Sequence, residues 1–395
     1  MAIDIPRIQS ALKDDRLDGW LLYDFHGSNR IARTICQLDG ASKLTTRRWY
    51  YLIPAHGEPR GLVHRIEPHS LSQVPGTREV YADRQQLVDG LRTIIGDCHT
   101  LAMEYSPNGE IPYISLVDAG TVEAVRGLGV TVVSSGDLVQ RFEAVWNADA
   151  LATHRSASEC LYRIKDRAFA LIAERLGSQT PTTEFDVQRE MVAWFESEGL
   201  ITDCPPVVAA RENGGDPHYL PTADRCRRIE PGDPILLDLW GKHPTDGAVF
   251  ADITWMGFAG PEVPDEYAKA FSVICAARDA AVAAVTSAAS SGRELQGWEV
   301  DHAARREIEN AGLGQYFVHR TGHSLGQSVH GNGVHMDDYE THDTRRLLPG
   351  TGFTIEPGVY FDSFGLRTEI NMFVGQEGAA VTGPIQTEIA PLLPT

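Results

Sequence analysis

Basic residues are scarce in this chain relative to acidic ones. Lys and Arg number 35 against 54 Asp and Glu, which gives a formal net charge of −19 at pH 7. A chain of this charge lacks the basic surface that phosphate binding requires, so nucleic acid is excluded as its main partner. The acidity itself is explained by solubility.

Paired cysteines and long apolar runs are lacking as well. The six cysteines are widely scattered and form no Cys-x-x-Cys motif, which predicts reduced thiols in a cytosolic protein rather than a disulfide framework or a zinc knuckle. The N-terminal segment has no apolar core of the signal-peptide kind. The most apolar helical stretch, residues 270–290, is rich in Ala and interrupted by Arg278 and Asp279, so we expect no membrane span.

The chain has 395 residues, which is enough for two domains with separate cores. Residues 1–150 alternate helical and strand-like patterns, which predicts an α/β domain. The expected helices cover about residues 5–17, 83–95 and 111–128. The expected strands cover 19–23, 101–105 and 129–135, with a hairpin at 49–53 and 61–65.

Residues 151–395 predict a second domain, of the α+β class. Helices are expected at 152–176 and 183–199, and the segment TPTTEFD suits the N-cap and acidic first turn of the second. From Pro205 onward strands with glycine turns dominate, interrupted by helices at about 265–287 and 297–311. Helices segregated from an antiparallel sheet are typical of this class.

Two aspartates in this second region flank a turn. Asp238 and Asp252 are 14 residues apart, and the segment HPTDG between them predicts a hairpin. Both lie in apolar runs, where burying a carboxylate is costly unless it is ligated or hydrogen-bonded. Taken alone, the pair is also compatible with turn or edge-strand residues that cap the local backbone.

Two histidines stand seven residues apart in the glycine-rich segment GHSLGQSVHG. Glycines allow close backbone approach and leave room for a substrate. His323 is the candidate metal ligand, and His330 is a candidate to hydrogen-bond a developing oxyanion or to orient substrate. A pair of structural histidines is the alternative, and we assign His319, His335 and His342 to structural roles.

Two glutamates lie on expected strands around the turn FDSFG. Glu356 precedes a Pro-Gly break, and Glu369 lies in the strand-like segment GLRTEINMFV. One carboxylate suits a bridge between two metals, and the other suits a ligand that also takes a proton from the attacking water. Solvent-facing strand glutamates are the alternative. Arg367, two residues before Glu369 on the same strand face, either pairs with Glu369 or reaches a substrate carboxylate.

Four carboxylates and one imidazole carry too much negative charge to cluster without cations, because like charges raise one another's pKa unless a metal compensates. An oxygen-rich set with one imidazole suits Mn, Co or Zn. Shared carboxylates suit two ions about 3.5–4 Å apart that activate a bridging water. The candidate ligands of this metal centre are Asp238, Asp252, His323, Glu356 and Glu369.

With these residues identified, the chain resembles the pita-bread metallopeptidases: methionine aminopeptidase, prolidase (Xaa-Pro dipeptidase) and aminopeptidase P, with creatinase as a metal-free relative. The resemblance covers about residues 150–395 and rests on the order Asp–Asp–His–Glu–Glu and on the segments HRTGHSLGQSVHG, TIEPGVYF and GLRTEINMFV. It implies a pita-bread catalytic domain at 151–395. It also implies a creatinase-like N-terminal α/β domain at 1–150, which methionine aminopeptidases lack.

The resemblance implies two divalent ions per chain, with manganese favoured and cobalt or zinc as alternatives. Asp238 would ligate one ion, Asp252 and Glu369 would bridge both, and His323 and Glu356 would complete the second ion's sphere. Glu356 would also act as general base toward the bridging water.

The resemblance also implies roles for three further residues, and for His218 it is the only argument. His218, on a loop after Gly-Gly and Asp-Pro, would hold substrate together with His330 and stabilise the tetrahedral intermediate. Arg367 would support the site or the substrate. The resemblance also implies a homodimer.

The chain departs from the family pattern at three places. The hairpin between the aspartates is longer than usual by roughly three residues, which could reshape the rim of the pocket. Ser324 stands where relatives often carry Gly, and Ile370 where they often carry Asp. These two positions put fine specificity in question, but not the metal centre.

The expected activity is hydrolysis of Xaa-Pro bonds by a metal-bridging hydroxide, in a cytoplasmic dipeptidase or aminopeptidase. Its partners would be small peptides with proline at the second position. Two alternatives stay open. One is a non-peptidase hydrolase or lyase on the same fold, as in creatinase, and the other is a non-catalytic pita-bread protein used for protein interaction. The intact ligand set argues against the metal-free and the non-catalytic readings.

Overall fold

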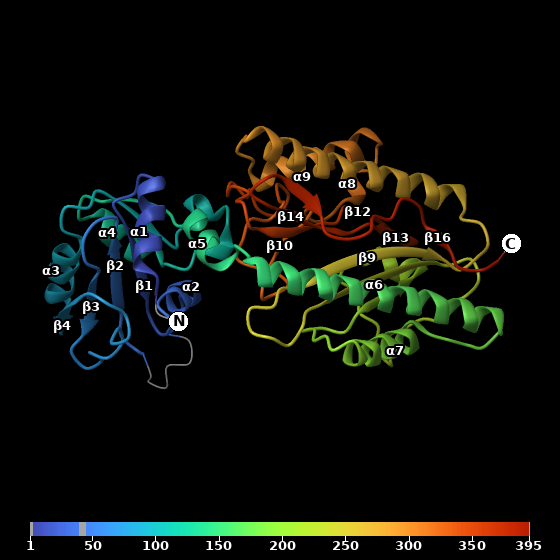
Figure 1. Ribbon diagram of the computed structural model, residues 1–395, viewed down its shortest axis with the longest axis horizontal. Coiled ribbons are helices and arrows are strands. Elements are labelled where there is room, and N and C mark those ends of the chain that lie inside the picture. The colour runs from blue at the N-terminus through green and yellow to red at the C-terminus, as the bar shows by residue number, and fades with distance from the viewer. Residues whose placement is uncertain (1–2, 39–44, 395) are drawn as a thin grey trace. The chain divides into compact units, whose positions relative to one another are not determined.

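The computed structural model describes residues 3–38 and 45–394. It contains two compact units that divide between Phe142 and Glu143. The division expected from the sequence, between 150 and 151, lies within helix α6 (Ala148–Gly177). Each unit has its own sheets and its own hydrophobic clusters, and Figure 1 draws both units.

The first unit is a mixed sheet flanked by helices. Its strand order is β4-β3-β2-β1-β5-β6, in which β1 runs antiparallel to β2 and parallel to β5. The strands are β1 Gly19–Asp24, β2 Trp49–Pro54, β3 Arg60–His64, β4 Thr77–Tyr81, β5 Thr100–Met103 and β6 Thr131–Ser134. The helices are α1 Ile5–Asp14, α2 Arg30–Ile35, α3 Arg84–Ile95, α4 Ala119–Arg126 and α5 Gly136–Glu143. The expected α/β character and the β2–β3 hairpin are confirmed.

The helix expected over residues 111–128 is wrong in its first half. Only a short 3-10 turn, Pro112–Ile114, forms there, and α4 begins at Ala119. Pro112 has no backbone N–H to donate. The Asp118 side chain then accepts a hydrogen bond from the backbone N–H of Thr121 at 2.9 Å, which sets the start of α4.

The second unit places helices on both sides of its sheets (Figure 1). Helices α6 and α7 (Glu184–Ser197) pack on the sheet β16-β9-β8-β7, and α8 (Asp265–Ser291) and α9 (Gly297–Asn310) pack on the sheet β10-β11-β14-β15. The first sheet contains β7 Val207–Ala210, β8 Pro234–Gly241, β9 Ala251–Phe258 and β16 Ala390–Pro391. The second contains β10 Ser324–Leu325, β11 Gly352–Ile355, β14 Ile370–Val374 and β15 Ala379–Val381, and β12 Gly358–Phe361 forms a hairpin with β13 Phe364–Arg367. Short 3-10 turns lie at Pro107–Gly109, Arg211–Gly215 (η3) and Gly314–Tyr316.

Two helices of this unit illustrate how the sequence determines them. The Thr183 hydroxyl caps α7 by accepting a hydrogen bond from the backbone N–H of Asp186. The Asp186 carboxylate accepts in turn from the backbone N–H of Thr183, as the segment TPTTEFD predicts. Helix α8 is long and apolar enough to cross a membrane by length and composition alone. However, it contributes many buried residues to the hydrophobic core of this unit and buries Arg278, which is the pattern of a core helix.

The chain changes sheets at the two predicted glutamates. Glu356 follows β11 and precedes β12, while Glu369 follows β13 and precedes β14. The expectation that Arg367 and Glu369 share one continuous strand is therefore wrong, because β13 pairs with β12 and β14 pairs with β11. Both side chains nevertheless line one pocket, so the alternation of side chains persists across the break.

Candidate metal centre

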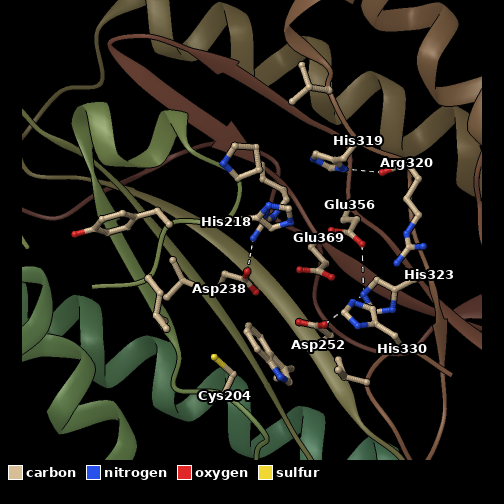
Figure 2. Close-up of a pocket in the computed structure, with 18 of the residues that line it drawn as sticks. Cys204, His218, Asp238, Asp252, His319, Arg320, His323, His330, Glu356 and Glu369 are labelled. Atoms are coloured by element: carbon tan, nitrogen blue, oxygen red, sulfur yellow. Dashed lines mark hydrogen bonds and ion pairs between the residues drawn. The ribbon is translucent and has the colours of Figure 1, made fainter. Parts of the chain in front are cut away.

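One pocket of the second unit, about 620 Å³ in volume, gathers all eight candidate site residues. In Figure 2 the four labelled carboxylates and His323 face a common space. The predicted residues in its lining are Asp238, Asp252, His323, Glu356, Glu369, His218, His330 and Arg367. Their sequence positions span 151 residues, so only the fold brings them together.

The antiparallel pairing of β8 with β9 brings the two aspartates to one face. Asp238 lies opposite Thr254, and Asp252 lies opposite Trp240. Asp238 and Asp252 are thus diagonal neighbours, a relation that puts two side chains on the same side of a sheet within reach of a shared ion. The hairpin predicted from HPTDG is confirmed.

His323 presents its Nε2 atom to the carboxylates. This nitrogen lies 3.4 Å from Glu356 Oε1 and 3.6 Å from Asp252 Oδ2. The other ring nitrogen, Nδ1, lies 3.3 Å from the Ser324 carbonyl oxygen, which can only accept a hydrogen bond. Nδ1 therefore carries the proton and Nε2 offers a lone pair, which is the tautomer that a metal ligand requires.

Two threonines orient the two glutamates, and sequence reasoning missed both. The Thr354 hydroxyl accepts from the His323 backbone N–H at 2.9 Å and donates to Glu356 Oε1 at 3.0 Å. The Thr254 hydroxyl donates to Glu369 Oε2 at 2.7 Å. Each threonine lies two residues from a predicted ligand on the same strand face, Thr354 before Glu356 and Thr254 after Asp252. Period-two spacing was the signal that could have found them.

Arg367 pairs with Asp238 rather than with Glu369. Its Nη2 atom contacts Asp238 Oδ2, and its Nε atom donates to the Thr254 hydroxyl at 2.9 Å. The Thr254 hydroxyl accepts from Arg367 and donates to Glu369, so the guanidinium reaches Glu369 through this threonine. Arg367 is buried, and its contacts hold the side chain of Asp238 directly and that of Glu369 through Thr254.

His319, which we assigned to a structural role, also lines the pocket. Its Nδ1 lies 2.7 Å from the Arg320 carbonyl oxygen, so Nδ1 is protonated and Nε2 accepts from the Tyr360 hydroxyl at 2.8 Å. That hydroxyl accepts in turn from Arg367 Nη1 at 3.2 Å. A hydrogen-bonded chain thus runs from Arg367 through Tyr360 to His319. The 41-residue separation of His319 and Tyr360 hid it from sequence reasoning.

Without a cation, the ionised form of three of the pocket carboxylates is disfavoured. Burial raises the pKa of Asp252 and of Glu369 well above the ordinary values, and neighbouring carboxylates raise them further. Burial also raises the pKa of Asp238, although the Arg367 charge opposes this. A bound cation would oppose these shifts, because its positive charge stabilises the ionised carboxylates.

His319 and His330, two imidazoles of the pocket, are neutral near pH 7. Burial lowers the pKa of His323, and it lowers the pKa of His319 and of His330 to about 4. The His323 and His330 rings are 4.4 Å apart, centre to centre. Burial alone would raise the pKa of Glu356, but the neighbouring His323, His319 and Arg367 outweigh burial and bring it below its ordinary value.

The residues present fit a metal ion. Asp252 Oδ1 is buried and, within residues 3–38 and 45–394, has no hydrogen-bond partner. Ligand atoms of Asp252, His323 and Glu369 all lie within 4.8 Å of one another. An unsatisfied buried carboxylate oxygen facing an imidazole lone pair and a second carboxylate is explained by a divalent cation between them.

Comparison with known proteins identifies this arrangement. The family model of metallopeptidase family M24 matches residues 153–376. The chain belongs to metallopeptidase family M24. Membership in M24 implies divalent metal ions, and it confirms the expected metallo-exopeptidase class.

Individual relatives of this M24 chain are dipeptidases by name. "Probable dipeptidase PepE" of Mycobacterium tuberculosis is 27% identical over 353 residues, which cover 87% of this chain and 86% of the relative. "Xaa-Pro dipeptidase" of Lactobacillus delbrueckii subsp. lactis is 30% identical over 212 residues, 52% of this chain and 51% of the relative. The crystal structure of PepE from Mycobacterium ulcerans superposes with a TM-score of 0.67 at 23% identity, covering 98% and 97% of the two chains. The predicted fold, an α/β N-terminal domain followed by a pita-bread domain, is confirmed.

Proposed function

We propose that this M24 protein is a dinuclear metal-dependent exopeptidase that hydrolyses Xaa-Pro bonds in small peptides. The observation that carries the proposal is the convergence of four carboxylates and one imidazole on a single pocket, with one buried carboxylate oxygen left unpartnered among the described residues. Asp238 would hold one ion, Asp252 and Glu369 would bridge two, and His323 and Glu356 would complete the second. When bound, the ions activate a water molecule as nucleophile and polarise the scissile carbonyl.

The residues around the ions have separate tasks in this proposal. Glu356 has a lowered pKa and is held by Thr354 through Oε1, so it is ionised and able to accept a proton from the attacking water. His330 is neutral and faces His323, so it can donate a hydrogen bond to the oxygen on which negative charge develops. His218 lines the same pocket from the loop after η3, where it can orient the peptide.

Arg367 acts from behind the ligands. It is tied to Asp238, Thr254 and Tyr360, so its guanidinium supports the metal ligands and is not free to reach a substrate carboxylate. Of the two roles that the sequence left open, we therefore favour support of the site.

A panel of small peptides tests the proposal. An Xaa-Pro dipeptide, the matching Xaa-Ala dipeptide, an Xaa-Pro-Xaa tripeptide and creatine are each incubated with protein that has been loaded with Mn²⁺. Cleavage of the Xaa-Pro dipeptide supports a dipeptidase, which agrees with the names of the relatives. Cleavage of the tripeptide alone moves the assignment to an aminopeptidase. Turnover of creatine by metal-free protein would contradict the proposal and favour the creatinase-like alternative.

Manganese as the native metal, a homodimer and a cytoplasmic location stay predictions of the sequence. Activity measured after reconstitution of the metal-free protein with Mn²⁺, Co²⁺ or Zn²⁺ ranks the metals, since all three tolerate this ligand set. Sedimentation equilibrium gives the assembly state.

A further inference from the structure

Helix α8 buries one charged side chain, that of Arg278. The Arg278 side chain is only 1% exposed. It pairs with Asp279 through Nη2 at 2.8 Å and through Nε at 2.9 Å, although the Asp279 side chain itself is 63% exposed. A buried guanidinium is costly unless its remaining donors are also satisfied. The acceptors of those donors therefore show which segments the guanidinium holds in place.

One donor points at the residue between two site residues. Arg278 Nη1 donates to the Thr368 hydroxyl at 2.9 Å. Arg367 and Glu369, on either side of Thr368, line the pocket. Because side chains alternate along an extended chain, the Thr368 side chain must point to the opposite side, toward α8.

The break between β13 and β14 makes this contact important. Thr368 and Glu369 lie outside both strands. The backbone N–H of Thr368 donates to the Pro357 carbonyl at 3.3 Å, and the backbone N–H of Glu369 donates to the Thr254 carbonyl at 3.3 Å. Both distances are longer than typical N–H···O bonds. The hydrogen bond from Arg278 to the Thr368 side chain, at 2.9 Å, is shorter than either.

The same guanidinium also reaches the strand that carries the other bridging candidate. Arg278 Nη1 donates to the Gln386 carbonyl oxygen at 2.5 Å. The Gln386 side-chain amide bonds both backbone groups of Met256, at 2.7 and 2.8 Å. Met256 lies on β9, four residues after Asp252. Arg278 therefore connects the segment of Glu369 to the strand of Asp252.

We propose that Arg278 is a positioning residue for the metal centre, which acts through Thr368 to fix the orientation of Glu369. This inference rests on the proposed function, in which Glu369 bridges the ions. Residues that hold metal ligands in place typically contribute 10–100-fold to metal affinity. Arg278 does so from helix α8, and its side chain does not line the pocket.

The decisive variant is Thr368→Val, which keeps the shape of the side chain but removes the hydroxyl and leaves the bond from Arg278 to Gln386 in place. We expect metal affinity to fall by roughly tenfold, measured by titration of the metal-free protein in a metal buffer. The visible absorption spectrum of the Co²⁺-loaded protein should shift, and hydrogen exchange at the Glu369 amide should accelerate in the metal-free protein. Thr368→Ser should restore all three readouts.

Cys275→Ala provides the matched control, because the Cys275 thiol lies 3.7 Å from both Arg278 Nη1 and the Gln386 carbonyl and, within the described part of the chain, forms no hydrogen bond with Thr368. This control should leave metal affinity and the Co²⁺ spectrum unchanged. Equal loss of metal affinity in Cys275→Ala and Thr368→Val would reduce the effect to general core damage and overturn the inference. Unchanged metal affinity in Thr368→Val, with a wild-type protein that binds metal, would overturn the inference alone. A wild-type protein that binds no metal would overturn the proposed function as well.

Discussion

The two units of this protein each bury a carboxylate, and the two carboxylates have opposite surroundings. In the first unit Glu104 is fully buried and accepts hydrogen bonds from Trp20 Nε1 at 2.7 Å, Asn29 Nδ2 at 2.7 Å and the Ser135 hydroxyl at 3.1 Å. In the second unit Asp252 is also buried, yet one of its oxygens has no partner among the described residues, and other carboxylates surround it. Both carboxylates are buried, but protein donors hydrogen-bond both oxygens of Glu104 and leave one oxygen of Asp252 without a partner among the described residues.

This difference separates structural acids from candidate metal ligands. Glu184 in the second unit follows the pattern of Glu104, because it accepts from the backbone of Ala210 and Arg227 and from the Tyr219 hydroxyl at 2.5 to 2.7 Å. Buried polar groups that the protein satisfies are part of the packing. A buried acid that the protein leaves unsatisfied, facing other acids, requires a cation.

The comparison predicts its largest effect at Asp252. Asp252→Ala removes a proposed bridging ligand, so metal binding and peptide hydrolysis should be lost together, with a decrease in kcat/KM of about a thousandfold or more. Glu184→Gln is the control, since Glu184 is equally part of the second unit but lies outside the pocket. Retained turnover in metal-free Asp252→Ala would refute the assignment.

The reverse prediction concerns Glu104. Glu104→Leu removes the acceptor of three buried hydrogen bonds, from Trp20, Asn29 and Ser135, and should destabilise the first unit by roughly 3 kcal/mol or more, measured by urea unfolding. Metal affinity should be unchanged, because protein donors satisfy Glu104 and it lies outside the pocket. A drop in metal affinity without a loss of stability would break the distinction between the two acids.

Metal binding should release protons. In the metal-free protein burial and the neighbouring carboxylates raise the pKa of Asp252 and of Glu369 well above the ordinary values, and ligation requires the carboxylates to be deprotonated. Calorimetric titrations in buffers of different ionisation enthalpy give the number released. We expect a net release of protons that becomes smaller as the pH rises. A heat of binding independent of the buffer would show that the carboxylates are already ionised.

The smallest effect concerns a satisfied histidine. His154 is buried, its ring nitrogens lie 2.8 Å from the Phe250 carbonyl and the Thr382 hydroxyl, and burial lowers its pKa to about 4. Between about pH 6.5 and 4 the unfolded chain binds a proton here and the folded chain does not, so stability falls on acidification. The full contribution is ~3 kcal/mol. His154→Gln should flatten this part of the unfolding free energy against pH, and an identical slope in both proteins would contradict the assignment.

The sequence predicted those parts of the site that local patterns encode. Asp238, Asp252, His323, Glu356 and Glu369 each lie beside a turn or a glycine-rich segment that places a polar side chain in an apolar surrounding. The pairing of β8 with β9 follows from such local signals.

Contacts between distant segments were beyond sequence reasoning. His319 was assigned to packing because its partner Tyr360 is 41 residues away, and Arg278 was noted only as an interruption of an apolar run. Period-two spacing left Arg367 either to pair with Glu369 or to reach a substrate carboxylate, but in the structure, where the chain changes sheets at Thr368, Arg367 pairs with Asp238. Such choices depend on how strands assemble, which local patterns do not specify.

The most direct test of the account is the metal stoichiometry of the purified protein, measured by elemental analysis after loading with Mn²⁺ and removal of free metal, alongside Asp252→Ala and Glu104→Gln. The account predicts about two ions per chain in the wild-type protein and in Glu104→Gln, and none in Asp252→Ala. A wild-type protein without bound metal, or an Asp252→Ala variant that still holds two ions, would contradict it.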